Sequence, residues 1–289
     1  MKLLKELLLD IKSDTIIGDT NIAINGIHFN SSHVTESSLF VAIIGNLQDG
    51  HQFIKTAISL GAVAIICEKI PDQVIDFITY VEVQDSSIAL SMLASSFFNH
   101  PSNKIKLIGI TGTNGKTSTA YYLTQLFQAL KFKVGLISTI ENCINNESFP
   151  SQYTTPDSVE INRLLAEMVN RGCEFCFMEV SSHAIIQNRI SSLNFDIGVF
   201  TNISRDHLDY HKTFNEYILA KKSFFDDLSD SSTSIINLDD LEGATMVLNT
   251  KSTPLFYSIQ NRSDFSAKII ESSINGLTLK MNDVEISTK

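Results

Sequence analysis

The sequence predicts an α/β protein of two domains: an N-terminal α/β domain, then a central domain with a mostly parallel sheet flanked by helices. Three observations support this fold class. Apolar runs of strand length alternate with runs of helix length along the chain. A glycine-rich stretch joins one strand-like run to one helix-like run. The length of 289 residues is enough for about two domains.

We place the first domain at residues 1–103. Leucines at positions 3, 4, 7 and 8 have helical spacing. They predict an amphipathic helix rather than a signal peptide, because Glu6 and Asp10 interrupt the apolar run and no small-residue cleavage site follows. The next predicted strands cover residues 22–27, 39–43, 62–67 and 80–83, and the predicted helices cover residues 51–60 and 87–98. The polar segment after Pro101 predicts a hinge.

The second domain covers residues 104–289. Its predicted strands cover residues 105–110, 134–137, 175–180, 197–201 and 234–237, and its predicted helices cover residues 117–130, 157–171 and 214–228. Thr155 followed by Pro156 is typical of a helix start, with Thr155 as the N-cap. Because apolar strands separated by helices form parallel sheets, ligands are expected at the carboxyl ends of the strands.

Composition excludes several classes of protein. The net charge of −10 argues against a general nucleic-acid binder, which needs clustered Lys and Arg. No apolar run approaches the ~20 residues that span a bilayer, so we expect a cytoplasmic protein without membrane insertion. Cys173 and Cys176 have the spacing of a metal or redox pair, but no second pair completes a site. We therefore expect all four cysteines, the others being Cys67 and Cys143, to be free core thiols.

Residues 109–118 read Gly-Ile-Thr-Gly-Thr-Asn-Gly-Lys-Thr-Ser, between a strand-like and a helix-like run. Such a turn places backbone N–H groups and a helix N-terminus at one point, where phosphates bind. Lys116 supplies a charge for the outer phosphates, and the Thr117 hydroxyl can bind Mg²⁺. Ile110 stands where the general motif has its first glycine, and Gly112 follows two residues later. The segment predicts a site for a nucleoside triphosphate.

Polar residues at two other strand ends extend this site. Glu179 ends an apolar strand, where a buried carboxylate is costly unless a metal or a hydrogen-bond donor satisfies it. His207 lies in a polar segment after the strand at 197–201; it could be a Mg²⁺ ligand, but a helix-capping or surface histidine fits equally well. Lys221 and Lys222 adjoin an apolar helix face, and spacing alone does not choose between them. We expect the loop, Glu179 and the segment at 201–206 to converge.

Three motifs in this order, Gly-Thr-Asn-Gly-Lys-Thr, Glu-Val-Ser-Ser-His and Asn-Ile-Ser-Arg-Asp-His-Leu-Asp-Tyr-His, resemble those of the Mur ligases of peptidoglycan synthesis. The resemblance covers essentially the whole chain and implies an ATP- and Mg²⁺-dependent amide-bond ligase. It implies that the ATP phosphates contact Gly112, Thr113, Asn114, Gly115, Lys116, Thr117 and Ser118. It assigns Mg²⁺ to Thr117, Glu179 and His207, a carbamylated lysine ligand to Lys221, and an adenine contact to Asn237. Lys116, Lys221, Glu179 and His207 would be the catalytic residues.

The resemblance also implies a substrate, UDP-MurNAc-L-Ala-D-Glu, to which the third amino acid of the stem peptide is added. Its binding residues would be Ser31, Asn46, Leu47, Gln48, Tyr153, Thr154, Thr155, Ser181, Gln187 and Arg189. Two neighbours of Ser31 depart from the family's Asp-Ser-Arg segment, because Asn30 and Ser32 stand there. Tyr153 stands where some relatives carry Asn. Arg189 suits a planar carboxylate.

The family has a third, C-terminal domain that binds the incoming amino acid, and this sequence ends before it. We expect this polypeptide alone to be monomeric, to bind nucleotide weakly and to ligate poorly. The motifs leave the third amino acid open. The alternatives are a non-catalytic module that binds nucleotide or UDP substrate, another Mur or folylpolyglutamate-type ligase, and a P-loop kinase. A kinase would not need the N-terminal domain or Lys221.

Overall fold

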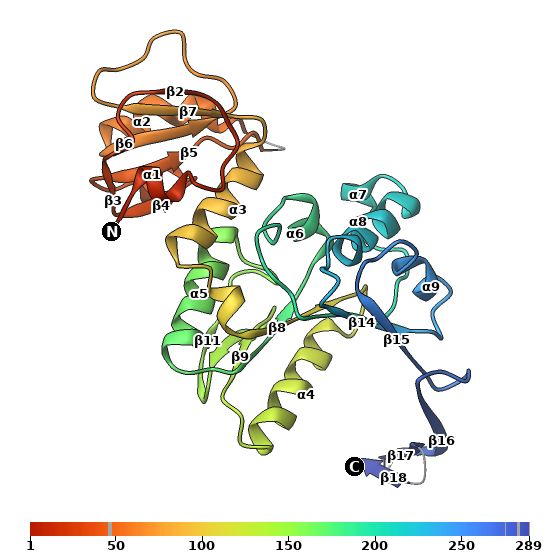
Figure 1. Ribbon diagram of the computed structural model, residues 1–289. Helices are drawn as coiled ribbons and strands as arrows, with labels where there is room; N and C mark the ends of the chain where they lie inside the picture. The colour runs from red at the N-terminus through yellow and green to blue at the C-terminus, as the bar shows by residue number, and fades with distance from the viewer. Residues whose placement is uncertain (46–47, 275, 282–283, 289) are drawn as a thin grey trace. The chain divides into compact units, whose positions relative to one another are not determined.

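The computed structural model describes residues 1–45, 48–274, 276–281 and 284–288. The chain divides into two compact units (Figure 1). Unit 1 comprises residues 1–104, 156–169 and 187–193, and unit 2 comprises the remaining segments. The domain boundary between residues 103 and 104 remains our prediction. No helix within the described ranges has the length and apolar character needed to cross a membrane.

Unit 1 is built on a five-stranded sheet in the order β2-β7-β6-β5-β4. Its strands are β2 (Ser13–Ile17), β4 (Gly26–His28), β5 (Ser38–Val41), β6 (Ala62–Cys67) and β7 (Thr79–Val83). Strands β4 to β7 are parallel, and β2 pairs with β7 in the antiparallel sense. The short strands β1 (Lys2–Leu3) and β3 (Ala23–Ile24) form a separate pair.

The sheet of unit 1 is buried on both faces. Alternate residues of one strand enter different cores: Ala64 and Ile66 pack in the cluster of α3 (Ser86–Phe97), whereas Ile65 and Cys67 pack in the cluster of α2 (Ile54–Ser59). This two-sided burial explains the unbroken apolar sequence of β6. The predicted N-terminal helix is short, since α1 covers only Leu4–Leu7, but its leucines enter the core as their spacing indicates.

Unit 2 contains, among the described residues, an eleven-stranded sheet in the order β11-β10-β9-β12-β8-β13-β14-β15-β16-β17-β18. The central strands are β8 (Lys106–Thr111), β9 (Val134–Ile137), β12 (Phe175–Glu179), β13 (Ile197–Phe200), β14 (Thr233–Asn237) and β15 (Thr253–Ser258). They pair in parallel, which confirms the predicted fold class. On one side, β10 (Glu141–Ile144) and β11 (Glu147–Pro150) continue the sheet in the antiparallel sense. On the other side, β16 (Phe265–Ser273) pairs with β15 in parallel, and β17 (Gly276–Met281) and β18 (Val284–Thr288) follow in the antiparallel sense.

The helices of unit 2 include α4 (Lys116–Ala129), α6 (Ser182–Ile186), α7 (Leu208–His211), α8 (Phe214–Asp226) and α9 (Gly243–Met246). Two glycines let α8 approach the sheet closely. Gly109 on β8 is the register partner of Gly198 on β13. A Cβ atom at Gly109 would lie 2.7 Å from the ring of Phe224, and one at Gly198 would lie 3.1 Å from it. Alanine at both positions would therefore exclude the Phe224 ring from this place against the sheet.

The predicted N-cap at Thr155 is wrong. Helix α5 covers Ser158–Asn170, and the Asp157 carboxylate caps it by accepting from the N–H groups of Val159 and Glu160, both at 3.0 Å. The Thr155 hydroxyl instead donates to the carbonyl of Glu179 at 2.8 Å. All four cysteines are free and buried, as expected. Burial raises the pKa of the Cys67 thiol to about 12.

Candidate functional site

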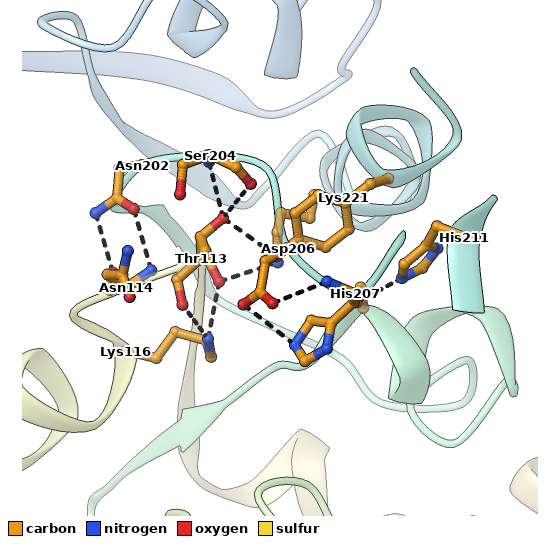
Figure 2. A network of polar contacts seen from close by, with 12 residues as sticks. Thr113, Asn114, Lys116, Asn202, Ser204, Asp206, His207, His211 and Lys221 are labelled. Carbon is orange, nitrogen blue, oxygen red and sulfur yellow. Dashed lines mark hydrogen bonds and ion pairs between the residues drawn. The ribbon is translucent and has the colours of Figure 1, made fainter. Parts of the chain in front are cut away.

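The glycine-rich loop connects the end of β8 at Thr111 to the start of α4 at Lys116 (Figure 2). Gly115, the N-cap of α4, has φ +85°, a conformation that favours glycine. Among the described residues, no side chain caps this helix. The first N–H groups of a helix have no intrahelical acceptor, so they are available to an anion.

Gly112 cannot carry a side chain in this loop. Its φ is +150°, and a Cβ atom there would lie 1.9 Å from the Thr201 hydroxyl oxygen. The loop therefore lies directly against the segment that follows β13 (Ile197–Phe200). This contact explains why the glycine falls at 112, two positions after the first glycine of the general motif.

Lys116 lies folded back onto its own loop. Its ammonium donates to the carbonyl oxygens of Gly112 at 2.8 Å and Thr113 at 2.9 Å. Burial lowers the pKa of Lys116, and the negative charges of Glu179 and Asp206 partly offset that effect. A positive charge is thus held at the loop where phosphates would bind.

Lys221 reaches the same loop from α8. Its side chain is 1% exposed, and its Nζ donates to the Gly112 carbonyl at 3.0 Å. The amine also lies 4.6 Å from the centroid of the Tyr217 ring. Burial, and next the charge of Lys116, lower the pKa of Lys221 to about 7, although Asp206 opposes them.

Lys222 has different surroundings, so the structure distinguishes the two lysines. Its ammonium pairs with Asp226 one turn along α8, at 2.5 and 2.7 Å from the two carboxylate oxygens. Lys222 is therefore an ion-paired helix residue, whereas Lys221 contacts the loop.

Glu179 ends β12 beside the loop and is fully buried. Its carboxylate accepts from the Thr117 hydroxyl at 3.0 Å, the Thr139 N–H at 2.8 Å and the Thr139 hydroxyl at 3.2 Å. These hydrogen-bond donors satisfy the buried charge. The sequence left open whether such donors or a metal would do so. The carboxylate and the Thr117 hydroxyl also form a pair of adjacent oxygens, which are the ligands that Mg²⁺ prefers.

His207, the third proposed metal ligand, belongs to a cluster of rings. It has φ +51°, and its Nε2 lies 3.6 Å from the Asp206 carboxylate. Its ring centroid lies 5.1 Å from that of His183 and 6.1 Å from that of Tyr217. In the described part of the chain, no group of three or more His, Cys, Asp and Glu side chains is arranged to hold a metal by itself. Oxygens of a bound phosphate would have to complete a Mg²⁺ site here.

Asn237, the proposed adenine contact, lies at the end of β14. Its amide donates to the Thr201 carbonyl at 2.8 Å and accepts from the Asp239 N–H at 3.0 Å. The side chain thus connects the strand end to the segment beside the loop.

Some of the proposed substrate residues surround Glu179 in unit 2. Thr155 is buried, and besides contacting the Glu179 carbonyl, its hydroxyl accepts from the Ser181 N–H at 3.1 Å. The Thr154 hydroxyl lies 3.1 Å from that of Thr139, which donates to the Glu179 carboxylate. Tyr153 is 60% exposed. Thr154 and Thr155 therefore share one hydrogen-bond network with the carboxylate at the end of β12.

Other proposed substrate residues belong to unit 1. Ser31 begins a short 3₁₀ helix (Ser31–His33) that Asn30 caps, because the Asn30 side chain accepts from the Ser32 N–H at 3.0 Å. The guanidinium of Arg189 donates to the Gln187 side chain at 2.6 and 3.0 Å. Gln48 is exposed, and its carbonyl accepts from the N–H of residue 45 at 3.0 Å. Asn46 and Leu47 lie outside the described residues.

The segment at 201–206 lies beside the loop, as the sequence predicts, but several residues around the loop were not assigned a role individually. Thr139 contacts Glu179, and Thr201, Asn202 and Tyr217 contact the glycine-rich loop. Asp206 acts on Lys116 and Lys221 through its charge. Position after a strand of a parallel sheet is the signal that could have found Thr139, Thr201 and Asn202. No local pattern marks Tyr217, whose hydroxyl lies 3.2 Å from that of Thr113, 104 positions earlier.

Comparison with known proteins identifies the family of this chain. The family of the Mur ligase middle domain matches residues 110–289, and the catalytic domain of the Mur ligase family matches residues 23–98. The chain belongs to the Mur ligase family. It is 46% identical over 286 residues to the UDP-N-acetylmuramoyl-L-alanyl-D-glutamate–2,6-diaminopimelate ligase of Bacteroides fragilis. It is 39% identical over 285 residues to the enzyme of that name from Clostridium perfringens.

This Mur ligase chain spans only part of those relatives. The alignment covers 99% of the chain and 59% of the B. fragilis protein, and 97% of the chain and 58% of the C. perfringens protein. Solved structures share the fold. A diaminopimelate ligase structure superposes with a TM-score of 0.82 at 23% identity, covering 100% of this chain and 59% of that one. MurF ligase of Thermotoga maritima, in complex with ADP, gives 0.60 at 21% identity, covering 90% and 57%.

Proposed function

We propose that this Mur ligase chain binds ATP and UDP-MurNAc-L-Ala-D-Glu and activates the terminal carboxylate of the dipeptide for amide-bond formation with the third amino acid. The observation that carries the proposal is the convergence of Lys116, Lys221 and Glu179 on one glycine-rich loop. The names of the relatives support the substrate and make diaminopimelate the first amino acid to test.

ATP is the nucleotide that the loop would hold. The residues from Gly112 to Ser118 would surround the phosphates, with the N-terminus of α4 directed at them. Asn237 would meet the adenine. The ADP complex of the T. maritima structure supports this assignment, because that protein shares the fold.

Mg²⁺ fits the oxygen donors beside the loop. Thr117 and Glu179 offer adjacent oxygens, and His207 would add a nitrogen ligand. Bound Mg²⁺ would neutralise negative charge on the phosphates. The chain itself would contribute the buried Glu179 carboxylate, which Thr139 orients through two hydrogen bonds.

Lys221 is the residue that we assign to carbamylation. It is buried and contacts the loop, whereas Lys222 pairs with Asp226. The lowered pKa supports the assignment, because only a neutral amine attacks carbon dioxide. The Nζ–C bond forms as the amine attacks CO₂, one proton leaves to solvent, and the carbamate so formed offers two oxygens to a cation.

The reaction would proceed in two steps. The substrate carboxylate attacks the γ-phosphorus of ATP, forming an acyl phosphate as ADP leaves. The amine of the incoming amino acid then attacks the acyl carbon and loses one proton, and phosphate leaves. Lys116 would offset charge on the transferring group, which is where most catalysis of phosphoryl transfer lies.

The substrate would be held by the residues that the family resemblance assigns. Thr154, Thr155 and Ser181 surround Glu179, and Tyr153 precedes them. Ser31, Gln48, Gln187 and Arg189 in unit 1 would hold the uridine diphosphate and peptide ends, together with Asn46 and Leu47. We further propose that the protein acts as a cytoplasmic monomer.

The test follows an oxygen isotope from substrate to phosphate. UDP-MurNAc-L-Ala-D-Glu labelled with ¹⁸O in its terminal carboxylate is incubated with the chain, ATP, Mg²⁺ and diaminopimelate or lysine. Acyl-phosphate chemistry transfers ¹⁸O to the released phosphate, and we expect this transfer to be slow for the chain alone. Binding of both substrates without any transfer would identify a non-catalytic module. Transfer of the γ-phosphoryl group to an unrelated alcohol would identify a kinase.

A further inference from the structure

The two residues that follow β13, Thr201 and Asn202, hold the main chain of the glycine-rich loop, which we call the phosphate loop. The Thr201 N–H donates to the Thr111 carbonyl at 3.0 Å, which continues the strand pairing up to the loop. The Thr201 hydroxyl then donates to the Asn114 carbonyl at 2.7 Å. This hydroxyl occupies the space that a side chain at Gly112 would need.

Asn202 pairs with the main chain of Asn114 through both ends of its side chain. Its oxygen accepts from the Asn114 N–H at 3.0 Å, and its amide donates to the Asn114 carbonyl at 3.0 Å. The Asn202 carbonyl also accepts from the Thr113 N–H at 2.8 Å. Figure 2 shows the Asn202 side chain directed at Asn114, with dashed lines that mark its contacts with the Asn114 main chain. A two-point contact of this kind fixes the main chain on both sides of the Asn114 Cα atom, because it engages the two successive peptide groups that meet there.

These contacts divide the loop into two parts. The N–H groups of Thr113 and Asn114 are directed to Asn202, so a phosphate would use the N–H groups from Gly115 onward and those of the first turn of α4. Lys116 differs from this fixed part. Its ammonium donates to the carbonyls of Gly112 and Thr113, and its third N–H is left for a phosphate.

We propose that Thr201 and Asn202 are positioning residues that hold the phosphate loop in its binding conformation before the nucleotide arrives. The proposal rests on the proposed function, because it takes the loop to be a nucleotide site. Neither residue needs to touch the nucleotide: each acts through the main chain of Asn114. Preorganisation of this kind raises affinity by removing the cost of ordering the loop on binding.

The test compares the affinity for ADP of three variants by calorimetric titration, with the unfolding midpoint of each measured in parallel. Thr201→Val removes the hydroxyl and keeps the branched shape that a strand favours. Asn202→Ala removes both side-chain contacts with Asn114. Thr124→Val is the matched control, because its buried hydroxyl donates within α4, to the Ala120 carbonyl, away from the loop.

We expect Thr201→Val and Asn202→Ala each to weaken ADP binding about five- to tenfold, the effect of one or two lost hydrogen bonds. Thr124→Val keeps the wild-type affinity. If the wild type binds ADP and both loop variants bind it equally well, the proposal is overturned. A lowered unfolding midpoint without loss of ADP affinity would overturn it too. A wild-type chain that binds no ADP would count against the proposed function itself.

Discussion

The Lys221 ammonium donates to the carbonyl oxygen of Gly112 at 3.0 Å, across 109 positions of sequence. The contact depends on how closely α8 approaches the sheet. Phe224, one turn after Lys221, packs against Gly109 and Gly198, where a Cβ atom would clash. Two glycines in adjacent strands therefore bring a lysine to the phosphate loop.

Replacing Lys221 tests which lysine carries the carbamate. Lys221→Met should abolish the carbamate signal that ¹³C NMR detects when the protein is equilibrated with ¹³C-labelled bicarbonate near pH 8. Lys222→Met should retain it, because Lys222 is engaged by Asp226 in an ion pair. A carbamate that disappears in the Lys222 variant and persists in the Lys221 variant would reverse the assignment.

Glu179→Gln tests the cation site. The substitution keeps the shape of the side chain and removes its charge, so the gain in ADP affinity that Mg²⁺ produces should fall by about tenfold. Glu174→Gln is the control, because Glu174 lies just before β12, at the opposite end from Glu179, and its carboxylate accepts only a long 3.4 Å contact, among those described, from Lys133 N–H. If Mg²⁺ raised the ADP affinity equally in the two variants, Glu179 would not be part of the cation site.

Gly112→Ala should be much more damaging than Gly115→Ala. Both positions have positive φ, which costs a residue with a side chain about 1–2 kcal/mol. At Gly112 the new Cβ also meets the Thr201 hydroxyl, which adds about 1–3 kcal/mol of overpacking. At Gly115 the nearest atom is 4.0 Å away. Urea unfolding measures both free energies, and equal losses would mean that the loop does not pack against Thr201.

Asp239→Asn tests whether the charge of the Asp239 carboxylate stabilises the fold. This carboxylate, just after β14, accepts hydrogen bonds from residues at the end of β15 and just after it. Although burial raises the pKa of Asp239, hydrogen bonds from Ser258, Ile259, Gln260 and Asn261 outweigh it and lower the pKa below 3.8. A carboxyl with a lowered pKa in the folded state stabilises the fold above its ordinary pKa. This contribution is lost as pH falls through the folded value.

The wild type should therefore be more stable than Asp239→Asn at pH 7, and the difference should shrink as pH falls below 3.8. Thermal unfolding between pH 2.5 and 7 measures it. Asp230→Asn, in the exposed turn after α8, provides the comparison. A difference between wild type and Asp239→Asn that is constant with pH would show that the carboxylate charge is irrelevant.

The parallel strands of both units could be predicted from sequence because those strands are apolar on both faces. Strands β6 and β9 have the predicted bounds, and β12 differs by one residue. The antiparallel hairpin of β10 and β11 was missed, because its strands are short and partly polar. The Asn145-Asn146 turn between them, with φ +56° at Asn145, was the available signal.

The residues of the site that belong to local sequence motifs could be predicted. The glycine-rich loop, Glu179 and Lys221 were selected by motif, and the structure brings them into contact through Thr117 and Gly112. The choice of Lys221 over Lys222 needed the resemblance, since only packing gives them different partners. Thr201 and Asn202 were missed as individual residues because their role arises from the pairing of β13 with β8.

The most direct test of the central claim is the affinity of the chain for ADP in the presence of Mg²⁺, compared with that of Lys116→Met. The wild type should bind ADP, and the variant should bind it about ten- to a hundredfold more weakly, because a charge-assisted contact with phosphate is lost. Equal affinities, in two proteins with equal unfolding midpoints, would contradict the assignment of this loop as the nucleotide site.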